Sequence, residues 1–254
     1  MYRIADLHCH ILPYVDDGAE DMEVAMLLLR EAVRQGVQVM CLTPHLRQGM
    51  FETPDEVIRE RLERLRDARS EARLPIKLLL SREYHYDALL CARLESREII
   101  PIGDSSFILV EFSCHHTFKE IHEGIQKVIS HGYTPLIAHV ERYDVIRKDP
   151  GLVETLRSEG AYIQVNEGSI LGREGWKSRL VSHFLLKRGW VDVVASDAHD
   201  LDRRKPEMEK CADLLRRRYG EDVEKRLLWR NPLQICKDRM GNESDGTETE
   251  KNSR

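Results

Sequence analysis

Seven short apolar runs alternate with helical patterns along most of this 254-residue chain. Most of these runs are continuously apolar rather than alternating, as expected of parallel strands that are buried on both faces. The regular β/α alternation, without a break in composition, favours an α/β fold in a single domain. The predicted strands are residues 3–7, 37–42, 77–81, 107–111, 135–139, 161–165 and 191–195.

Helical patterns fill the intervals between these runs. The clearest spans residues 21–35, with Asp21 as a plausible N-cap and Gly36 just beyond its end. A second spans residues 54–73, where arginines interleaved with glutamates indicate a solvated face rather than a nucleic-acid-binding patch. Further helices are predicted near 118–131, 151–159, 176–189, 206–219 and 221–229.

The composition is that of an ordinary soluble globular protein, with 41% hydrophobic residues and a formal net charge of −5. It gives no reason to expect nucleic-acid binding or membrane insertion, and no apolar run approaches the roughly 20 residues of a membrane span. The six cysteines form no CxxC pair, so we expect a reduced, cytoplasmic protein. Residues 241–254 contain no apolar side chain, so we expect a folded domain over 1–240 and a disordered tail. Nothing in the sequence indicates the oligomeric state.

Imidazole and carboxylate groups follow nearly every predicted strand. His8 and His10 come just after the first strand, and residues two apart in a strand point to the same side. An H-x-H pair alone is a weak signal, but the pattern recurs along the chain. In a barrel of parallel strands the carboxyl ends converge on one mouth, whereas in an open sheet they spread along an edge. The recurrence therefore favours a barrel, and it makes nine residues candidate metal ligands: His8, His10, Asp17, His45, Glu83, Glu111, His139, Asp197 and His199.

These nitrogen and oxygen donors suit Mn, Fe or Zn better than a thiolate-bound structural zinc. Nine donors exceed what one ion needs and would serve two or three ions that share carboxylates. Clustered dications lower the pKa of a bridging water and hold a phosphate for in-line attack. Arg142 and Arg204 lie close to His139 and His199 in sequence, and guanidinium groups match phosphate oxygens.

The chain resembles the bacterial tyrosine phosphatases of the PHP (polymerase and histidinol phosphatase) superfamily, of the capsule and exopolysaccharide type (CpsB/CapC-like). The resemblance covers about residues 4–235. Its motifs are DLHCHILPYVDDGAED, CLTPH, VEF, PLIAHVERY, IQVNEGSILG, ASDAH followed by R-x-P, and a closing NPL, with Glu83 in its expected place.

This resemblance implies a distorted, TIM-like (β/α)7 barrel with a trinuclear, often manganese-containing centre. It implies one ion held by His8, His10, Glu83 and Asp197, a second by Glu83, Glu111 and His139, and a third by Asp17, His45 and His199. Arg142 and Arg204 match the phosphate-binding arginines, and with His199 they are the residues expected at the reacting phosphate. The implied activity is attack of a metal-activated hydroxide on phosphotyrosine. The implied substrate is the tail of a bacterial tyrosine autokinase that controls polysaccharide synthesis.

One departure from the family pattern precedes Glu83. A small residue is expected there, and this chain has Arg82. Strand alternation should turn Arg82 away from Glu83.

Four other functions were weighed against this one. A cysteine phosphatase needs C-x5-R in a phosphate-binding loop, and the three occurrences, which begin at Cys41, Cys91 and Cys211, fall in a predicted strand or in helical patterns. A PHP phosphatase of a small phosphomonoester, such as histidinol phosphate, is the nearest alternative. An amidohydrolase would commonly use a modified lysine, and no lysine stands at a predicted strand end. A non-catalytic metal-dependent binding module is disfavoured by the complete donor set.

Overall fold

The computed structural model describes residues 2–237, and within them all seven predicted strands are present. The predicted disorder of residues 241–254 lies outside the described residues. The strands of the predicted set are β1 (Ile4–Cys9), β2 (Val37–Leu42), β4 (Lys77–Leu80), β6 (Phe107–Glu111), β7 (Thr134–Ile137), β8 (Tyr162–Asn166) and β9 (Val193–Ala195). Two short strands that were not predicted, β3 (His45–Leu46) and β5 (Glu83–His85), resume β2 and β4 after two-residue breaks.

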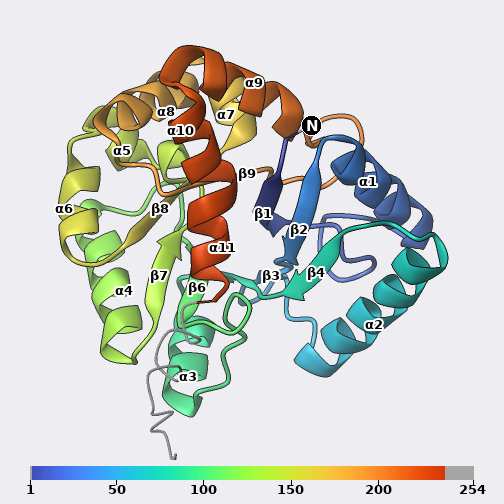
Figure 1. Cartoon of the computed structure of the whole chain (residues 1–254). Helices are drawn as coiled ribbons and strands as arrows, with labels where there is room; N and C mark the ends of the chain where they lie inside the picture. Colours follow the sequence, from blue (N-terminus) through green and yellow to red (C-terminus); the bar gives the residue numbers. More distant parts are fainter. Residues whose placement is uncertain (1, 238–254) are drawn as a thin grey trace, which may run out of the picture.

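All strand pairs are parallel, and together they follow a distorted seven-stranded barrel (Figure 1). One sheet has the order β1-β2-β4 and the other β3-β5-β6-β7-β8-β9. The breaks after β2 and β4 divide the sheets, but Ser81 N still donates to Leu42 O (2.9 Å). On the other side, Asp197 N donates to His8 O and His10 N to Ala198 O, both at 2.8 Å. These bonds join the segment after β9 to β1, so the ring closes at its carboxyl end.

Helices cover the outside of the barrel and follow the predicted ranges closely. Asp21 caps α1 by accepting a hydrogen bond from Val24 N (2.8 Å), and Gly36 after its end has a φ of 93°. Four short helices, α3, α5, α7 and α11, lie outside the predicted ranges, although the helical pattern noted at Cys91 falls within α3. The helices are α1 (Met22–Arg34), α2 (Asp55–Glu71), α3 (Ala88–Ser96), α4 (Phe118–Ser130), α5 (Asp144–Lys148), α6 (Leu152–Ser158), α7 (Glu167–Leu171), α8 (Trp176–Arg188), α9 (Met208–Tyr219), α10 (Glu221–Lys225) and α11 (Asn231–Ile235), with short η turns at η1 (Val140–Arg142) and η2 (Arg226–Arg230).

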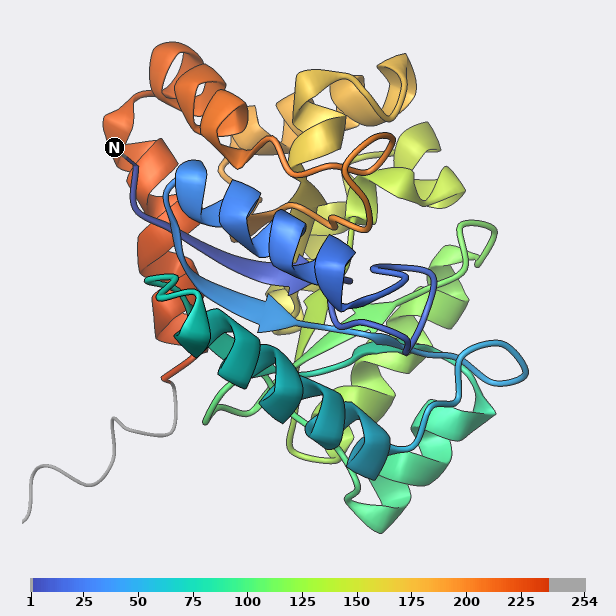
Figure 2. The same cartoon turned by 90° about the vertical axis from the view of Figure 1, so that its right-hand side faces the viewer.

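The strands are buried on both faces, and buried apolar side chains therefore form two cores. The larger lies between the strands and the surrounding helices, and the smaller fills the barrel with side chains such as Leu7, Leu109 and Leu136. Ile235 and Cys236, at the end of α11, join this interior core. In Figure 2 the last helices (red) lie at the start of β1 and β2, opposite the loops that follow these strands. The carboxyl-end mouth is therefore free for polar groups.

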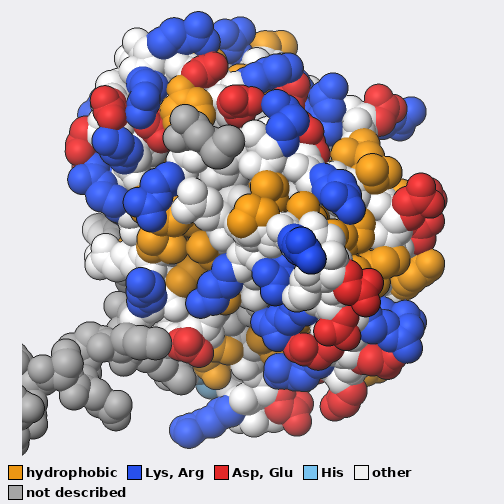
Figure 3. Space-filling model, turned by 45° about the vertical axis from the view of Figure 1, so that its right-hand side comes forward, with side chains coloured by type: hydrophobic (Ala, Val, Ile, Leu, Met, Phe, Trp, Pro, Cys, Tyr) orange, Lys and Arg blue, Asp and Glu red, His pale blue; other side chains and the backbone are white. Residues whose placement is uncertain are grey.

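The outer surface has mixed charge. Basic and acidic side chains are interspersed on the face shown in Figure 3. On α2, Arg64 pairs with Glu60 and Arg66 with Glu63, as predicted for a solvated face, although Arg66 and Arg69 also donate to carbonyls of the 74–78 segment. Among residues 2–237, no helix has the length and apolar character needed to span a membrane.

Candidate metal centre

The nine candidate ligands come together at the carboxyl end of the barrel. Five of them lie at or just after strand ends, His45 and Glu83 open β3 and β5, and Asp17 and His199 lie in the loops after β1 and β9. Their donor atoms form four overlapping groups in which all atoms lie within 4.8 Å of one another. The groups are His10–Asp17–His45–His199, His8–His10–Asp197, His8–Glu83–His139 and His45–Glu83–Glu111. The pattern of polar residues at strand ends thus predicted which side chains are neighbours.

The Nε2 atoms of His8 and His10 face each other. His8 Nδ1 lies 3.1 Å from the acceptor Gln164 Oε1, and His10 Nδ1 lies 2.8 Å from Asp16 Oδ2. Both Nδ1 atoms must therefore carry a proton, which leaves the Nε2 lone pair of each neutral ring free. The two Nε2 atoms are 3.1 Å apart, a repulsive arrangement unless a proton or a cation lies between them. The arrangement fits a shared metal ion.

Glu83 is fully buried at the centre of the cluster. Its Oε2 lies 3.3, 3.1 and 3.0 Å from ring nitrogens of His8, His10 and His45, and its Oε1 lies 2.9 Å from His139 Nε2. Burial alone would raise the pKa of this carboxyl group, but the surrounding imidazoles hold it well below its usual range. Glu83 is therefore an anion inside the protein, and such a charge requires a compensating partner.

The remaining donors extend the cluster in two directions. Toward β6, His139 Nε2 lies 3.6 Å from Glu111 Oε1. Toward the loop after β1, Asp17 Oδ1 lies 3.4 Å from His45 Nε2 and 3.5 Å from His199 Nε2. Burial, followed by repulsion from His10, lowers the pKa of His199 to about 4, so this ring is neutral and its lone pair is available.

Protons and metal ions compete for the same lone pairs in this cluster. Burial disfavours charge on His10, but Asp16 and Glu83 outweigh burial and raise the pKa of His10 to about 10. The carboxylates thus draw positive charge onto the ring, and a dication would supply that charge while displacing protons. Glu83 Oε2, His45 Nδ1, His139 Nδ1 and His199 Nε2 are buried without a hydrogen-bond partner in the described residues. Of these atoms, Glu83 Oε2, His45 Nδ1 and His199 Nε2 face the cluster and suit metal coordination, whereas His139 faces it with Nε2.

Two candidate ligands have strained backbones. His139 has a φ of 32° and Asp197 a φ of 51°, in the left-handed region that non-glycine residues rarely adopt. His139 follows β7 and Asp197 follows β9, and the left-handed turn directs both side chains into the cluster. Such conformations persist only where the surrounding structure enforces them, and they concentrate at functional sites.

Four supporting residues were missed by the sequence analysis. Asp16 orients His10, and Gln164 orients His8 while also accepting from His139 N (2.7 Å). Asn166 donates to Asp197 Oδ2 (2.9 Å), and His85 Nδ1 lies 3.1 Å from Glu111 Oε2. Strand alternation could have found one of them, because His85 is two residues after the candidate ligand Glu83. Groups of this kind fix the orientation of metal ligands.

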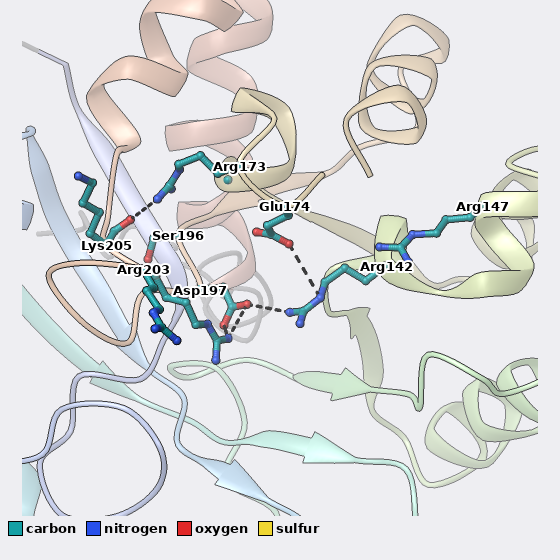
Figure 4. Close-up of a pocket in the computed structure, with 10 residues that line it drawn as sticks. Arg142, Arg147, Arg173, Glu174, Ser196, Asp197, Arg203 and Lys205 are labelled. Atoms are coloured by element: carbon teal, nitrogen blue, oxygen red, sulfur yellow. Dashed lines mark hydrogen bonds and ion pairs between the residues drawn. The ribbon is translucent and has the colours of Figure 1, made fainter. Parts of the chain in front are cut away.

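Arg142 and Arg204 meet at the same carboxylate. Arg142 Nη1 donates to Asp197 Oδ2 (3.2 Å), and Arg204 Nη2 lies 2.9 and 3.0 Å from the two Asp197 oxygens. Both side chains are about one-third exposed, so their guanidinium groups remain accessible. Figure 4 shows the Arg142 side chain reaching toward Asp197 across the pocket.

Arg82 turns away from the cluster, as strand alternation predicted. Its guanidinium donates to Thr53 O and His45 O, both at 2.9 Å, and pairs with Asp55. This departure from the family pattern therefore adds no charge at the mouth. Instead it links the backbone of His45 to the start of α2.

The cysteines of the C-x5-R strings lie where the sequence indicated. Cys41 is buried in β2, Cys91 lies in α3 and Cys211 is buried in α9. Burial raises the pKa of all three thiols, so none is a reactive thiolate.

Comparison with known proteins places this architecture in a family. The family model for capsular polysaccharide synthesis, CpsB/CapC, matches residues 4–237. The tyrosine-protein phosphatase CpsB of Streptococcus pneumoniae is 36% identical over 240 residues, which cover 92% of this chain and 99% of that protein. The tyrosine-protein phosphatase YwqE of Bacillus subtilis is 31% identical over 218 residues, or 86% of each chain.

A solved structure agrees with these matches. It is described as one of the crystal structures of YwqE from Bacillus subtilis and CpsB from Streptococcus pneumoniae, "unique metal-dependent tyrosine phosphatases". It superposes on this chain with a TM-score of 0.86 at 29% identity, covering 92% of this chain and 95% of its own. The resemblance predicted from the motifs is confirmed, and the chain belongs to the CpsB/CapC family of capsular polysaccharide synthesis.

Proposed function

We propose that this chain is a metal-dependent protein tyrosine phosphatase that hydrolyses phosphotyrosine. The observation that carries the proposal is the pair of His8 and His10 Nε2 atoms, 3.1 Å apart and facing buried Glu83, in a chain whose relatives are named tyrosine-protein phosphatases. Membership of the family supports the activity, and the donor geometry supports its dependence on metal.

The nine donors would hold up to three ions. His8, His10, Glu83 and Asp197 would hold one, Glu83, Glu111 and His139 a second, and Asp17, His45 and His199 a third. Manganese is our first choice, with iron or zinc as alternatives, because the donors are imidazoles and carboxylates. When bound, such ions lower the pKa of a water molecule and neutralise charge on a phosphoryl group.

The protein's own groups position the substrate. Arg142 and Arg204 both donate hydrogen bonds to Asp197, and beside it their guanidinium groups would bind phosphoryl oxygens. His199 would lie beside the reacting phosphate as well as serving as a ligand. Phe51 stacks on His45 with ring centroids 5.0 Å apart, which offers an apolar surface beside the cluster for the leaving aryl group.

The acid–base demands of the reaction favour an aryl ester. Tyrosinate has a parent pKa of about 10, so it departs with little help from an acid. In this proposal the histidines and carboxylates of the cluster serve as ligands, and none is reserved as a general acid. A serine alkoxide would need such an acid, so we expect aryl phosphates to react much faster than alkyl phosphates.

The proposed physiological substrate is the phosphotyrosine-containing tail of a bacterial tyrosine kinase of polysaccharide synthesis. Support comes from the family's description and from its relatives' names. The six free cysteines support a reducing compartment, which we propose to be the cytoplasm.

The test compares three substrates under identical metal supply: a phosphotyrosyl peptide, its phosphoseryl counterpart and histidinol phosphate. We expect the phosphotyrosyl peptide to be hydrolysed with a kcat/KM far above the other two. Equal turnover of the phosphoseryl peptide would refute the aryl preference. Faster turnover of histidinol phosphate would favour a phosphatase of small phosphomonoesters instead.

A further inference from the structure

A cavity of about 350 Å³ opens beside the candidate metal centre and shares Asp197 with it. Its lining carries six cationic side chains and only two carboxylates, Glu174 and Asp197. The cationic residues are Arg142, Arg147, Arg173, Arg203, Arg204 and Lys205. We call this feature the cationic cavity. The whole chain has a net charge of −5, so this concentration of positive charge is local.

Most of these cations are held in place by the protein. Arg173 donates to Glu167 (2.6 Å) and to Lys205 O (3.1 Å), and Arg147 donates to Ser178 Oγ (2.7 Å) and Glu141 O (3.1 Å). The guanidinium groups of these two arginines are therefore held in place by hydrogen bonds and form part of the cavity lining. In Figure 4, Arg147 and Arg142 lie on one side of the pocket, and Arg203 and Lys205 on the other.

Arg203 and Lys205 are the uncommitted cations of the cavity. Both are exposed, and within residues 2–237 neither side chain makes a hydrogen bond or ion pair. Their backbone is nevertheless fixed, because Asp200 Oδ1 accepts from the amides of residues 202–204 at 2.7–3.1 Å. The Lys205 charge lies near the carboxylates of Glu31 and Glu207, so Arg203 is the charge most available to a ligand, and Lys205 adds to the positive potential beside it.

The cavity is larger than one phosphoryl group requires. A cavity needs a volume of only about 10–15 Å³ to hold one water molecule. A cavity of about 350 Å³ therefore has room for further groups beside a phosphoryl group bound by Arg142 and Arg204. Because the side chains that line the cavity are mostly positively charged, the cavity favours anions.

We propose that the cationic cavity binds a second anionic group of the substrate, close in its chain to the phosphotyrosine that is hydrolysed. This inference rests on the proposed function, because Arg142 and Arg204 would hold the reacting phosphoryl group. Arg203 and Lys205 then contact the neighbouring group, which is a carboxylate or a second phosphoryl group. The preferred substrate is accordingly a polyanionic segment rather than an isolated phosphotyrosine.

The experiment uses the metal-loaded full chain and three peptides of equal length. One has a single phosphotyrosine with neutral neighbours, one has glutamates beside it, and one has a second phosphotyrosine. The test variant is Arg203→Gln combined with Lys205→Gln. The matched control is Arg59→Gln with Lys187→Gln, two exposed cations on α2 and α8 that do not line the cavity.

For the unaltered protein we expect KM to be about tenfold lower for the two polyanionic peptides, with kcat similar, and this advantage to shrink in high salt. The test variant should lose most of the advantage and keep its kinetics on the neutral peptide. Comparison of the glutamate and doubly phosphorylated peptides distinguishes the two kinds of anion. Equal KM for all three peptides, or equal losses in test and control variants, would overturn the inference while leaving the phosphatase activity intact. No hydrolysis of any of the three peptides would overturn the proposed function itself, and the inference with it.

Discussion

Asp197 separates two regions of opposite electrostatic character. On one side its Oδ1 lies 3.4 and 3.6 Å from the Nε2 atoms of His8 and His10, among buried groups that attract cations. On the other side its carboxylate accepts hydrogen bonds from Arg142 and Arg204, at the rim of a cavity that attracts anions. One carboxylate thus stands between the proposed metal site and the proposed phosphate site. The adjacency itself suits the hydrolysis of a phosphate ester.

The largest expected effect comes from removing the charge at the centre of the cation-attracting side. Glu83→Gln leaves the shape but removes the anion around which four imidazoles gather. We expect loss of bound metal and a fall in kcat/KM of more than about 100-fold, beyond the loss typical of outer-shell partners. Metal analysis and phosphotyrosyl-peptide kinetics measure both. Glu60→Gln, exposed on α2, is the control, and normal metal content in Glu83→Gln would contradict the assignment of Glu83 as a central ligand.

On the anion-attracting side, the first test is Arg142→Ala. Loss of a preorganised group that stabilises charge in the transition state typically costs on the order of 2–4 kcal/mol, so kcat/KM should fall about 10²–10³-fold. Bound metal should be unchanged, which distinguishes this variant from Glu83→Gln. Arg142→Lys should recover only part of the activity because it lacks the guanidinium fork. Unchanged kcat/KM in Arg142→Ala would show that Arg142 does not contact the substrate.

A smaller effect is expected from residues that orient the candidate ligands without being ligands themselves. Gln164→Leu removes the acceptor that fixes His8 Nδ1 and the oxygen that receives His139 N. Metal affinity should weaken about 10–100-fold, and excess metal should restore activity. A metal titration monitored by turnover measures the shift. Gln126→Leu, exposed on α4, should titrate like the unaltered protein, and an identical titration for Gln164→Leu would mean that Gln164 does not orient the ligands.

The smallest effect is expected at the thiols. Cys41→Ser, Cys91→Ser and Cys211→Ser should each keep most of the activity, since burial raises the pKa of all three and keeps them protonated. Kinetics at constant metal content test this. A loss of several orders of magnitude in Cys41→Ser, with metal retained, would replace the metal mechanism by a cysteine mechanism.

The barrel and its candidate ligands were predictable because both depend on local patterns. Buried parallel strands appear as apolar runs, and polar residues at their carboxyl ends converge in any barrel. The short strands β3 and β5 were not predicted, because two or three residues carry no periodicity. The five-residue helices α5, α7 and α11 were missed for a similar reason, because each is little more than one turn long.

The supporting layer and the cationic cavity depend on contacts that cross the chain. Gln164 reaches His8 across 156 positions, and no local pattern in the sequence records that pairing. The cavity draws cations from the segments around residues 142–147, 173 and 203–205, so its charge exists only after folding. The left-handed backbone at His139 and Asp197 is likewise set by tertiary structure, because only a minority of histidines and aspartates adopt that conformation and no local pattern marks which ones do.

The central claim is that the clustered imidazoles and carboxylates form a metal centre on which turnover depends. The direct measurement is phosphotyrosyl-peptide hydrolysis by protein stripped with a chelator, followed by titration with manganese, iron or zinc and metal analysis at each point. We predict that activity disappears with the metal, returns with added dication, and saturates at two to three ions per chain. Full activity in a preparation shown to be metal-free would contradict the account.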